Sequence, residues 1–270
     1  MFKHIILSSN HHGQLHAGFA KTIKFCRNLI LPHLDVHSVR SDDILRTNLQ
    51  YLYKKNMELQ GPRLNIGGDH SITIATGACS LNMHPRTKFI WIDAHPDINT
   101  YESSSTKNVH GMPVAYLTGQ MNPLHPLQFS FLQNQLKYKD LLYIGIRSID
   151  PYEQDVIDAK KIRVIKSQAC NDHIDDVLYQ IDQFVGHSGN PLHVSFDVDS
   201  LDPVFMPSTG TPVNDGLQKS SAKKILKHVM NKHNVFNMDF TELNLTLGTK
   251  AQQGISRQSA VDILRTIKVI

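Results

Sequence analysis

The sequence has little of several features that define whole classes of proteins. Only three of its 270 residues are cysteines, Cys26, Cys79 and Cys170, and an odd number without close spacing excludes a disulfide framework. We expect three reduced, buried thiols in a cytoplasmic protein. No basic run is longer than a pair and the net charge is only +4, which argues against nucleic acid as a partner. The apolar run near the N-terminus is too short for a signal peptide or a membrane span, so we expect no membrane partner.

The composition instead fits a folded chain. Hydrophobic residues make up 40% of the sequence and charged residues 19%, which is too apolar for a disordered protein. No repeat or low-complexity stretch divides the chain. Because α/β folds routinely run to about 200–250 residues as one unit, we expect a single domain spanning residues 1–270.

Short apolar runs predict strands that are covered on both faces, as in a parallel sheet. They lie at residues 3–7, 63–66, 88–92, 141–146, 162–165, 192–196 and 235–240. Apolar stripes between them predict helices around residues 44–53, 174–185, 225–230 and 261–267. Ser41 is the expected N-cap of the first helix, with Asp42 and Asp43 in its first turn, and Gly186 is expected to end the second. This alternation predicts an α/β fold, a three-layer α/β/α sandwich around a mainly parallel sheet.

Three stretches do not follow this alternation, namely residues 100–109, 121–138 and 200–219. The first and third are rich in polar, glycine and proline residues and directly follow predicted strands. Long loops in a compact domain are unusual unless they build a site, so we expect these two to do so. The middle stretch is interpreted as a surface excursion.

Acidic residues and histidines follow the predicted strands directly. The strand at 63–66 is followed by Gly-Gly-Asp-His (67–70), the strand at 88–92 by Asp-Ala-His-Pro-Asp (93–97), and the strand at 192–196 by Asp-Val-Asp (197–199). Ligands of open parallel sheets bind beyond the carboxyl ends of the strands, so these clusters are expected to converge on one crevice. Burying so many unpaired carboxylates would cost several kcal/mol per ion, as an order of magnitude, so a positive group is needed among them.

A pair of metal ions is the simplest such group. The side chains concerned are four carboxylates and two imidazoles: His70, Asp93, His95, Asp97, Asp197 and Asp199. Asp93, His95 and Asp97 are spaced by two residues, as are Asp197 and Asp199, so in extended backbone each set would face one side. Four negative charges would neutralise two divalent ions, and oxygen-rich ligands with some imidazole suit Mn²⁺. Two bridged ions would form a hydrolytic site with an activated hydroxide. Taken alone, Asp-x-His-x-Asp could equally be a strand-end turn with capped aspartates.

Five segments resemble signature segments of the ureohydrolase family, and of arginases in particular. They are GGDHS (67–71), WIDAHPDINT (91–100), NVHGMP (108–113), SFDVDSLDP (195–203) and TGTPV (209–213). The resemblance covers the chain from about residue 62 onward. It implies an eight-stranded parallel sheet and a binuclear manganese centre, with two Mn²⁺ per subunit, that hydrolyses a guanidino group to urea and an amine. It also implies that His70, Asp93, Asp97 and Asp197 hold one ion, while His95, Asp93, Asp197 and Asp199 hold the other.

The resemblance further implies roles around the metal centre, and these roles favour L-arginine as substrate, giving L-ornithine. Glu242 would hold the guanidinium with Thr211 nearby, His110 would be the proton shuttle, and Asp97 would assist proton transfer. The α-carboxylate would be held by the loop that contains Asn99, Ser104, Thr106 and Asn108, and the α-ammonium by Asp150 and Glu153. Without the resemblance, the loop residues could simply form turns, and Asp150 before Pro151 could be a helix N-cap.

Some features depart from the arginase pattern. Lys107 stands where arginases usually carry glycine, and it could tighten or crowd the binding of a carboxylate. The segment after the first predicted strand is short and carries His11, His12 and His16, which we interpret as exposed or amphipathic-helix residues and not as ligands. The alternative functions are hydrolysis of another guanidino or formimino compound, such as agmatine, guanidinobutyrate or formiminoglutamate, and a non-catalytic binding protein. The family expectation is a homo-oligomer, a trimer or hexamer, although the chain ends at Ile270 without the tail that some arginases use between subunits.

Overall fold

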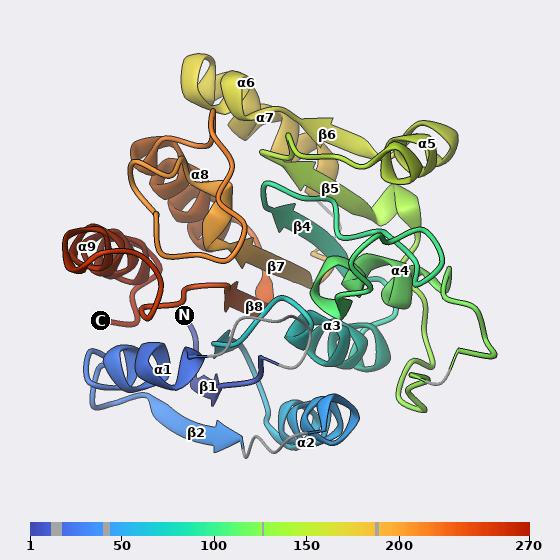
Figure 1. Cartoon of the computed structure of the whole chain (residues 1–270), viewed down its shortest axis with the longest axis horizontal. Coiled ribbons are helices and arrows are strands. Elements are labelled where there is room, and N and C mark those ends of the chain that lie inside the picture. Colours follow the sequence, from blue (N-terminus) through green and yellow to red (C-terminus); the bar gives the residue numbers. More distant parts are fainter. Residues whose placement is uncertain (12–17, 40–43, 126, 187–188) are drawn as a thin grey trace.

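The computed structural model describes residues 1–11, 18–39, 44–125, 127–186 and 189–270. In this part of the chain, eight strands form one sheet in the order β2-β1-β3-β8-β7-β4-β5-β6, and every neighbouring pair is parallel (Figure 1). The strands are β1 (His4–Ser8), β2 (Asp35–Val39), β3 (Arg63–Ile66), β4 (Lys88–Ile92), β5 (Leu141–Ile144), β6 (Arg163–Ile165), β7 (Leu192–Asp197) and β8 (Val235–Thr241). The predicted α/β class and parallel sheet are therefore confirmed.

Helices cover both faces of the sheet. One face packs against α1 (Phe19–Arg27), α6 (Ser167–Asp172), α7 (Ile174–Val185), α8 (Lys219–Lys232) and α9 (Lys250–Thr266). The other face packs against α2 (Leu45–Glu58), α3 (Ile72–Met83), α4 (Pro113–Thr118) and α5 (Pro151–Lys160). Short 3₁₀ turns η1 (Val109–Gly111), η2 (Tyr138–Asp140) and η3 (Val198–Ser200) lie in the connections. In Figure 1 the sheet runs between these two sets of helices, which gives the expected three layers.

The side chains of each strand divide between the two layers. Along β4, for example, Phe89 and Trp91 pack toward α3, whereas Ile90 and Ile92 pack toward the other face. Strands β3, β5 and β7 are buried along their whole length, and β5 is apolar throughout, as expected of a strand covered on both faces. The three cysteines are free and buried, as expected.

In the described part of the chain, strand β2 and helices α1, α3, α4 and α6 escaped the sequence prediction. Strand β2 was missed because it lies at the sheet edge, has only two apolar residues among its five, and is partly exposed. Helix α3 was missed because almost all of its residues are buried, so it has no polar face to reveal a helical period.

Helix ends follow the expected signals where these are described. Helix α7 ends at Val185, and Gly186 follows it with φ of 69°. Helix α5 begins at Pro151 with Asp150 as N-cap, and Asp150 and Glu153 form a capping box. Helix α2 begins at Leu45, and the expected capping residues 41–43 lie outside the described part. No helix in the described ranges is both long and apolar enough to cross a membrane.

Candidate metal centre and active site

A cavity of about 230 Å³ opens at the carboxyl ends of the strands. Segments after β3, β8, β7, β4 and β5 contribute to it, and these five strands are consecutive neighbours in the sheet. The cavity is lined by fourteen of the side chains predicted from the sequence, namely His70, His95, Asp97, Asn99, Ser104, Thr106, Asn108, His110, Asp150, Glu153, Asp197, Asp199, Thr211 and Glu242, together with Ser105 and Gly111. Asp93 is the remaining predicted residue, and it is buried within the same cluster. The two loops expected to build a site, 100–109 and 200–219, both contribute side chains to the cavity.

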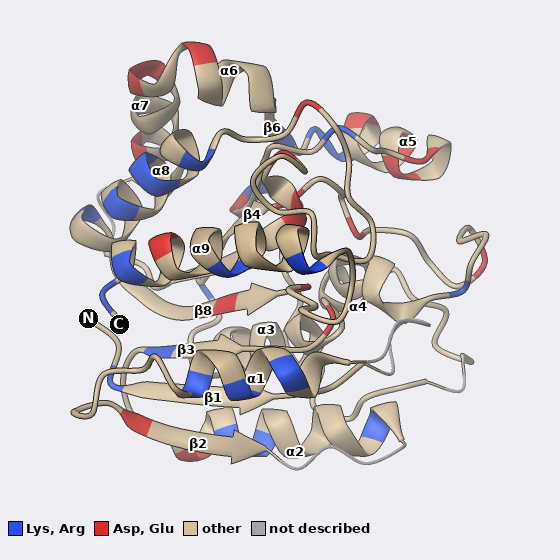
Figure 2. Ribbon diagram, turned by 60° about the vertical axis from the view of Figure 1, so that its left-hand side comes forward, with Lys and Arg blue, Asp and Glu red and all other residues tan. Residues whose placement is uncertain are grey.

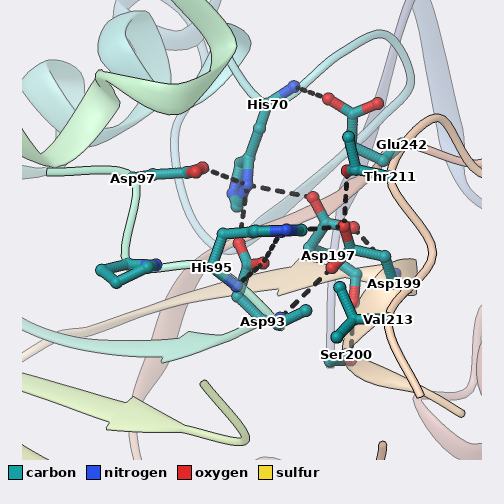
Figure 3. A network of polar contacts seen from close by, with 12 residues as sticks. His70, Asp93, His95, Asp97, Asp197, Asp199, Ser200, Thr211, Val213 and Glu242 are labelled. Carbon is teal, nitrogen blue, oxygen red and sulfur yellow. Dashed lines mark hydrogen bonds and ion pairs between the residues drawn. The ribbon is translucent and has the colours of Figure 1, made fainter. Parts of the chain in front are cut away.

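His70 lies at the centre of three carboxylates. Its Nδ1 is 3.0 Å from Asp93 Oδ2, 2.9 Å from Asp97 Oδ2 and 3.1 Å from Asp197 Oδ2. On the far side of the ring, Nε2 is 2.6 Å from Ser195 Oγ. Figure 3 shows the ring directed toward the acids, so that one nitrogen and three oxygens converge.

A second group of ligand atoms adjoins the first. His95 Nδ1 is 3.2 Å from Asp199 Oδ2 and 3.6 Å from Asp93 Oδ1. Asp93 therefore belongs to both groups. The ligand atoms of His70, Asp93 and Asp197 all lie within 4.8 Å of one another, and so do those of Asp93, His95 and Asp199. A shared carboxylate between two groups is the arrangement that a pair of neighbouring cations requires.

The way in which these side chains converge differs from the sequence prediction. We expected extended backbone to bring residues i and i+2 to one side, but β4 ends at Ile92 and the chain bends through residues 93–95. Asp97 has a φ of 51°, and Asp199 lies in the 3₁₀ turn η3. Backbone amides fix these turns, because Asp93 Oδ1 accepts from His95 N at 2.8 Å and Asp197 Oδ1 accepts from Asp199 N at 2.8 Å. The prediction of extended alternation was wrong, because tight turns and not the strand pleat aim the ligands.

The local electrostatics favour a bound cation. Burial, together with the charges of Asp199 and Asp93, raises the pKa of Asp197 well above its ordinary value. Burial and the charge of Asp93 raise the pKa of Asp97 to about 6. Although burial by itself would lower it, the surrounding carboxylates raise the pKa of His70. Without a cation, therefore, some of these side chains stay protonated, because protons then compensate the negative charge that a bound metal ion would otherwise compensate.

One buried atom tests whether these residues fit a metal. Nδ1 of His70 has no well-aligned hydrogen-bond partner among the described residues, although three carboxylate oxygens lie within 3.1 Å of it. This is expected of a nitrogen whose lone pair is directed at a cation and not at an acceptor. The donor set of imidazole and carboxylate also suits a divalent transition metal.

Glu242 and His110 form a pair beside the metal cluster. His110 Nδ1 is 3.0 Å from Glu242 Oε1, which also accepts a hydrogen bond from the backbone N–H of His70 at 2.8 Å. Glu242 follows β8 directly and has a φ of 65°. This backbone conformation is unusual for residues other than glycine, and it recurs at functional sites. Burial by itself would lower the pKa of His110, but Glu242 raises it to about 9, so the imidazole is protonated at neutral pH.

The cavity also contains a polar region that combines donors and acceptors. Asn99 Nδ2 donates to Asp150 Oδ2 at 2.8 Å, and Glu153 accepts from the backbone N–H groups of Ile98 and Asp150 at 3.1 and 3.0 Å. An amide that donates therefore lies next to a carboxylate that accepts, from the loop after β4 and the start of α5.

The loop that follows Asn99 is held by its own hydroxyl groups. Ser104 Oγ accepts from Lys107 N at 3.1 Å and Thr106 Oγ1 accepts from Asn108 N at 3.3 Å, so these residues do form turns. The two hydroxyls lie 3.4 Å apart, so one can donate to the other and the second still has a proton for a ligand. Lys107 has a φ of 61°, a backbone conformation that favours glycine. Its Nζ donates to Tyr101 O at 2.6 Å, and its side chain does not line the cavity.

Sequence reasoning missed several residues that support the site. Trp91 stacks on the His70 ring, with centroids 4.3 Å apart, and donates to Asp93 Oδ2 at 3.0 Å. Ser195 contacts the other side of the same imidazole. Arg147 donates to the carbonyls of Asp199, Val213 and Asn214 at 2.9, 2.7 and 2.8 Å, and so fastens the loop that carries Thr211.

The signals for these residues in the sequence are weak, because a Trp, a Ser and an Arg near strand ends are common. Of the N-terminal histidines, His11 contacts Ser9 O and does not line the cavity, while His12 and His16 lie outside the described residues.

Comparisons with known proteins agree with this geometry. The Arginase family model matches residues 8–268. An arginase of Neurospora crassa is 38% identical over 200 residues, which cover 71% of this chain and 55% of that protein, and arginase-1 of Mus musculus is 33% identical over 237 residues, covering 83% and 73%. The matched region thus spans little more than half of the first of these relatives.

Solved structures show the same likeness. The crystal structure of an arginase from Entamoeba histolytica in complex with L-ornithine superposes with a TM-score of 0.87 at 26% identity, over 100% of this chain and 99% of that one. The sheet, the cavity and these matches lead to one conclusion: the chain belongs to the arginase family.

Proposed function

We propose that the protein is a manganese-dependent arginase that hydrolyses L-arginine to L-ornithine and urea. The observation that carries this proposal is a single cavity with three parts: a cluster of aspartates and histidines, a buried glutamate beside it, and a polar region with paired donor and acceptor. An arginine molecule has three matching parts, namely a scissile guanidinium carbon, a cationic guanidinium and a zwitterionic head.

The residues that would hold two Mn²⁺ ions are His70, Asp93, Asp97, Asp197, His95 and Asp199. Ions bound there would supply Lewis acidity and lower the pKa of water toward neutrality, which provides a nucleophile for the guanidinium carbon. The chain itself contributes the orientation of these ligands through backbone amides and through Trp91, and it contributes burial, which excludes bulk water from the carboxylates.

Glu242 binds and orients the guanidinium in this proposal. A carboxylate matches the parallel N–H groups of a planar guanidinium, and Glu242 is fixed by its backbone contact to His70. Thr211, whose hydroxyl donates to Asp199 Oδ2 at 3.1 Å, stands at the same end of the cavity. Asp97 assists proton transfer as the carbon becomes tetrahedral, and His110 protonates the leaving amine, since Glu242 keeps its imidazole charged at neutral pH.

The polar region favours arginine over agmatine. The α-carboxylate requires donors, which Asn99, Ser104, Thr106 and Asn108 supply, and the α-ammonium requires acceptors, which Asp150 and Glu153 supply. The direct contact between Asn99 and Asp150 supports this assignment, because the two charged groups of an amino acid are also attached to one carbon. Agmatine lacks the carboxylate and would leave those donors unpaired. The L-ornithine complex of the Entamoeba histolytica protein agrees with an amino-acid ligand.

The proposal is tested with Mn²⁺-loaded protein and a chelator-treated control, by urea release from L-arginine, agmatine and guanidinobutyrate and by formamide release from formiminoglutamate. Release from arginine alone, abolished by the chelator and restored by Mn²⁺, is the expected result. Release from agmatine alone would contradict the role given to the 99–108 loop but not the metal centre. If none of the substrates reacts while two Mn²⁺ are bound, L-arginine is not the substrate, and the alternatives are another guanidino compound or a non-catalytic binding role. We further propose that the protein is cytoplasmic and forms a homo-oligomer, a trimer or hexamer. Size-exclusion chromatography with light scattering tests the oligomeric state.

A further inference from the structure

A second group of side chains that could bind a metal lies far from the cavity, at the amino ends of the strands and not at their carboxyl ends. Asp182 of α7, His228 of α8 and His233, which directly follows α8, bring one carboxylate and two imidazoles together. His233 is followed by Asn234, whose carbonyl accepts from Leu192 N at 2.8 Å, at the amino ends of β7 and β8. No proposed role in arginine hydrolysis uses these residues.

The three side chains share one focal point. Nε2 of His228 and Nε2 of His233 each lie 2.8 Å from the same oxygen, Asp182 Oδ1. The rings approach from different directions, with centroids 5.9 Å apart and planes at 66°. Two imidazoles and a carboxylate oxygen whose ligand atoms all lie within 4.8 Å of one another would supply three ligands of a tetrahedral ion, and the fourth position would be open for water.

From this arrangement we propose that Asp182, His228 and His233 form a second metal site that takes Zn²⁺. Imidazole nitrogen with a single carboxylate suits zinc, whereas manganese prefers sites richer in oxygen. Ligand atoms of a tetrahedral zinc ion stand about 3.3 Å apart for bonds of about 2.0–2.1 Å. The rings therefore need to withdraw from Asp182 by only a few tenths of an ångström to admit the ion.

The carboxylate of Asp182 divides its two oxygens between the histidines and a lysine. Nε2 of both imidazoles faces Oδ1. Lys232 contacts the other carboxylate oxygen, Oδ2, and leaves Oδ1 to the imidazoles.

The surrounding helices add a second, independent reason. Asp182 lies in the last turn of α7, and His228 and His233 lie at the end of α8, so the C-terminal ends of two helices meet here. Each end carries a partial negative charge that favours a cation. In Figure 2 these helices lie side by side at one edge of the molecule.

The cluster is also accessible. A surface cavity of about 500 Å³ reaches it and is lined by Asp182, His233, Lys232, Tyr179 and Asn190 among others. The side chains are neither deeply buried nor fully exposed, at 19% for His228, 20% for Asp182 and 8% for His233. An ion can therefore enter from solvent and be held by side chains that packing already positions. A zinc ion there would link α7 to α8, and this role does not depend on the proposed arginase activity.

The test measures zinc uptake by the Mn²⁺-loaded protein. Zinc is added in the presence of excess Mn²⁺, the protein is desalted, and both metals are quantified by mass spectrometry. The proteins compared are the wild type, His228→Ala, His233→Ala and a matched control, His33→Ala. His33 is an exposed histidine outside the cluster. We expect the wild type and His33→Ala to bind one more zinc ion than the other two variants, with equal Mn²⁺ in all four proteins. Loss of a ligand should weaken zinc binding by more than the ~10–100-fold that loss of an outer hydrogen-bond partner causes.

Two further results complete the test. Zinc should raise the melting temperature of the wild type but not that of His233→Ala, and Lys232→Met should bind zinc more tightly, because an ammonium near the ion is removed. Anomalous scattering at the zinc edge from wild-type crystals should show a peak between Asp182, His228 and His233, which requires no variant to fold. Equal zinc content in all four proteins, or no anomalous peak at this position, would overturn the proposal and show that the two imidazoles only donate hydrogen bonds to Asp182.

Discussion

Replacing Arg147 by lysine should loosen the loop that closes the metal centre. The guanidinium donates to three carbonyls at 2.9 Å or less, those of Asp199, Val213 and Asn214, from Nη2 and Nε. These carbonyls lie on both sides of the loop at residues 200–212. A lysine ammonium is a single point and cannot reach all three, so we expect Arg147→Lys to keep one of these bonds and to lose two.

The size of the effect follows from the number of bonds lost. A hydrogen bond from a charged donor contributes about 1.5–3 kcal/mol, so two of them would contribute roughly 3–6 kcal/mol if they were fully buried. Arg147 is only partly buried and water will hydrogen-bond to some of the freed carbonyls, so we expect a loss of about 2–4 kcal/mol in the free energy of unfolding. Because Asp199 is a proposed ligand of only one of the two ions, that ion should also bind more weakly.

The assay is urea denaturation of metal-free and Mn²⁺-loaded protein, with a Mn²⁺ titration of each variant. Arg86→Lys is the matched control, since Arg86 is exposed and should change stability by no more than about 0.5 kcal/mol. If Arg147→Lys is as stable as Arg86→Lys and binds both Mn²⁺ ions as the wild type does, the guanidinium does not hold this loop, and the reasoning fails.

The remaining predictions address the site itself. His110→Asn should keep its Mn²⁺ content by mass spectrometry while kcat falls about 100-fold or more, because an acid is lost; an unchanged kcat would remove His110 from the mechanism. Asp197→Asn should raise the melting temperature of the metal-free protein at neutral pH, because it removes the cost of burying a carboxyl whose pKa is raised on folding, and it should abolish the increase caused by Mn²⁺. Burial and the charge of Asp93 raise the folded-state pKa of Asp97 to about 6, so the metal-free protein should lose stability as pH rises from about 4 to 6, and Asp97→Asn should remove most of this pH dependence. Lys107→Gly should leave KM for arginine unchanged, because the lysine ammonium is held by the Tyr101 carbonyl outside the cavity.

The sequence by itself determined the local features of the molecule. Apolar runs located seven of the eight strands, because a strand buried on both faces needs an almost unbroken apolar segment. Strand-end acids and histidines indicated the candidate metal ligands, because burying that many carboxylates together requires a compensating positive charge. Asp150 before Pro151 indicated the start of α5, because both residues satisfy the first turn of a helix locally.

Only the tertiary structure decided how these parts meet. Strand β8 is last in the chain but lies between β3 and β7, which places Glu242 beside His70 across 172 residues of sequence. Asp182 and His233 are likewise 51 residues apart and meet only because α7 and α8 pack together. The ligands are aimed by turns with unusual backbone angles, such as that at Asp97, and not by the pleat of a strand. Residue patterns report which face of an element is buried, whereas contacts between distant segments depend on the order of the strands, and that order is fixed by packing over the whole sheet.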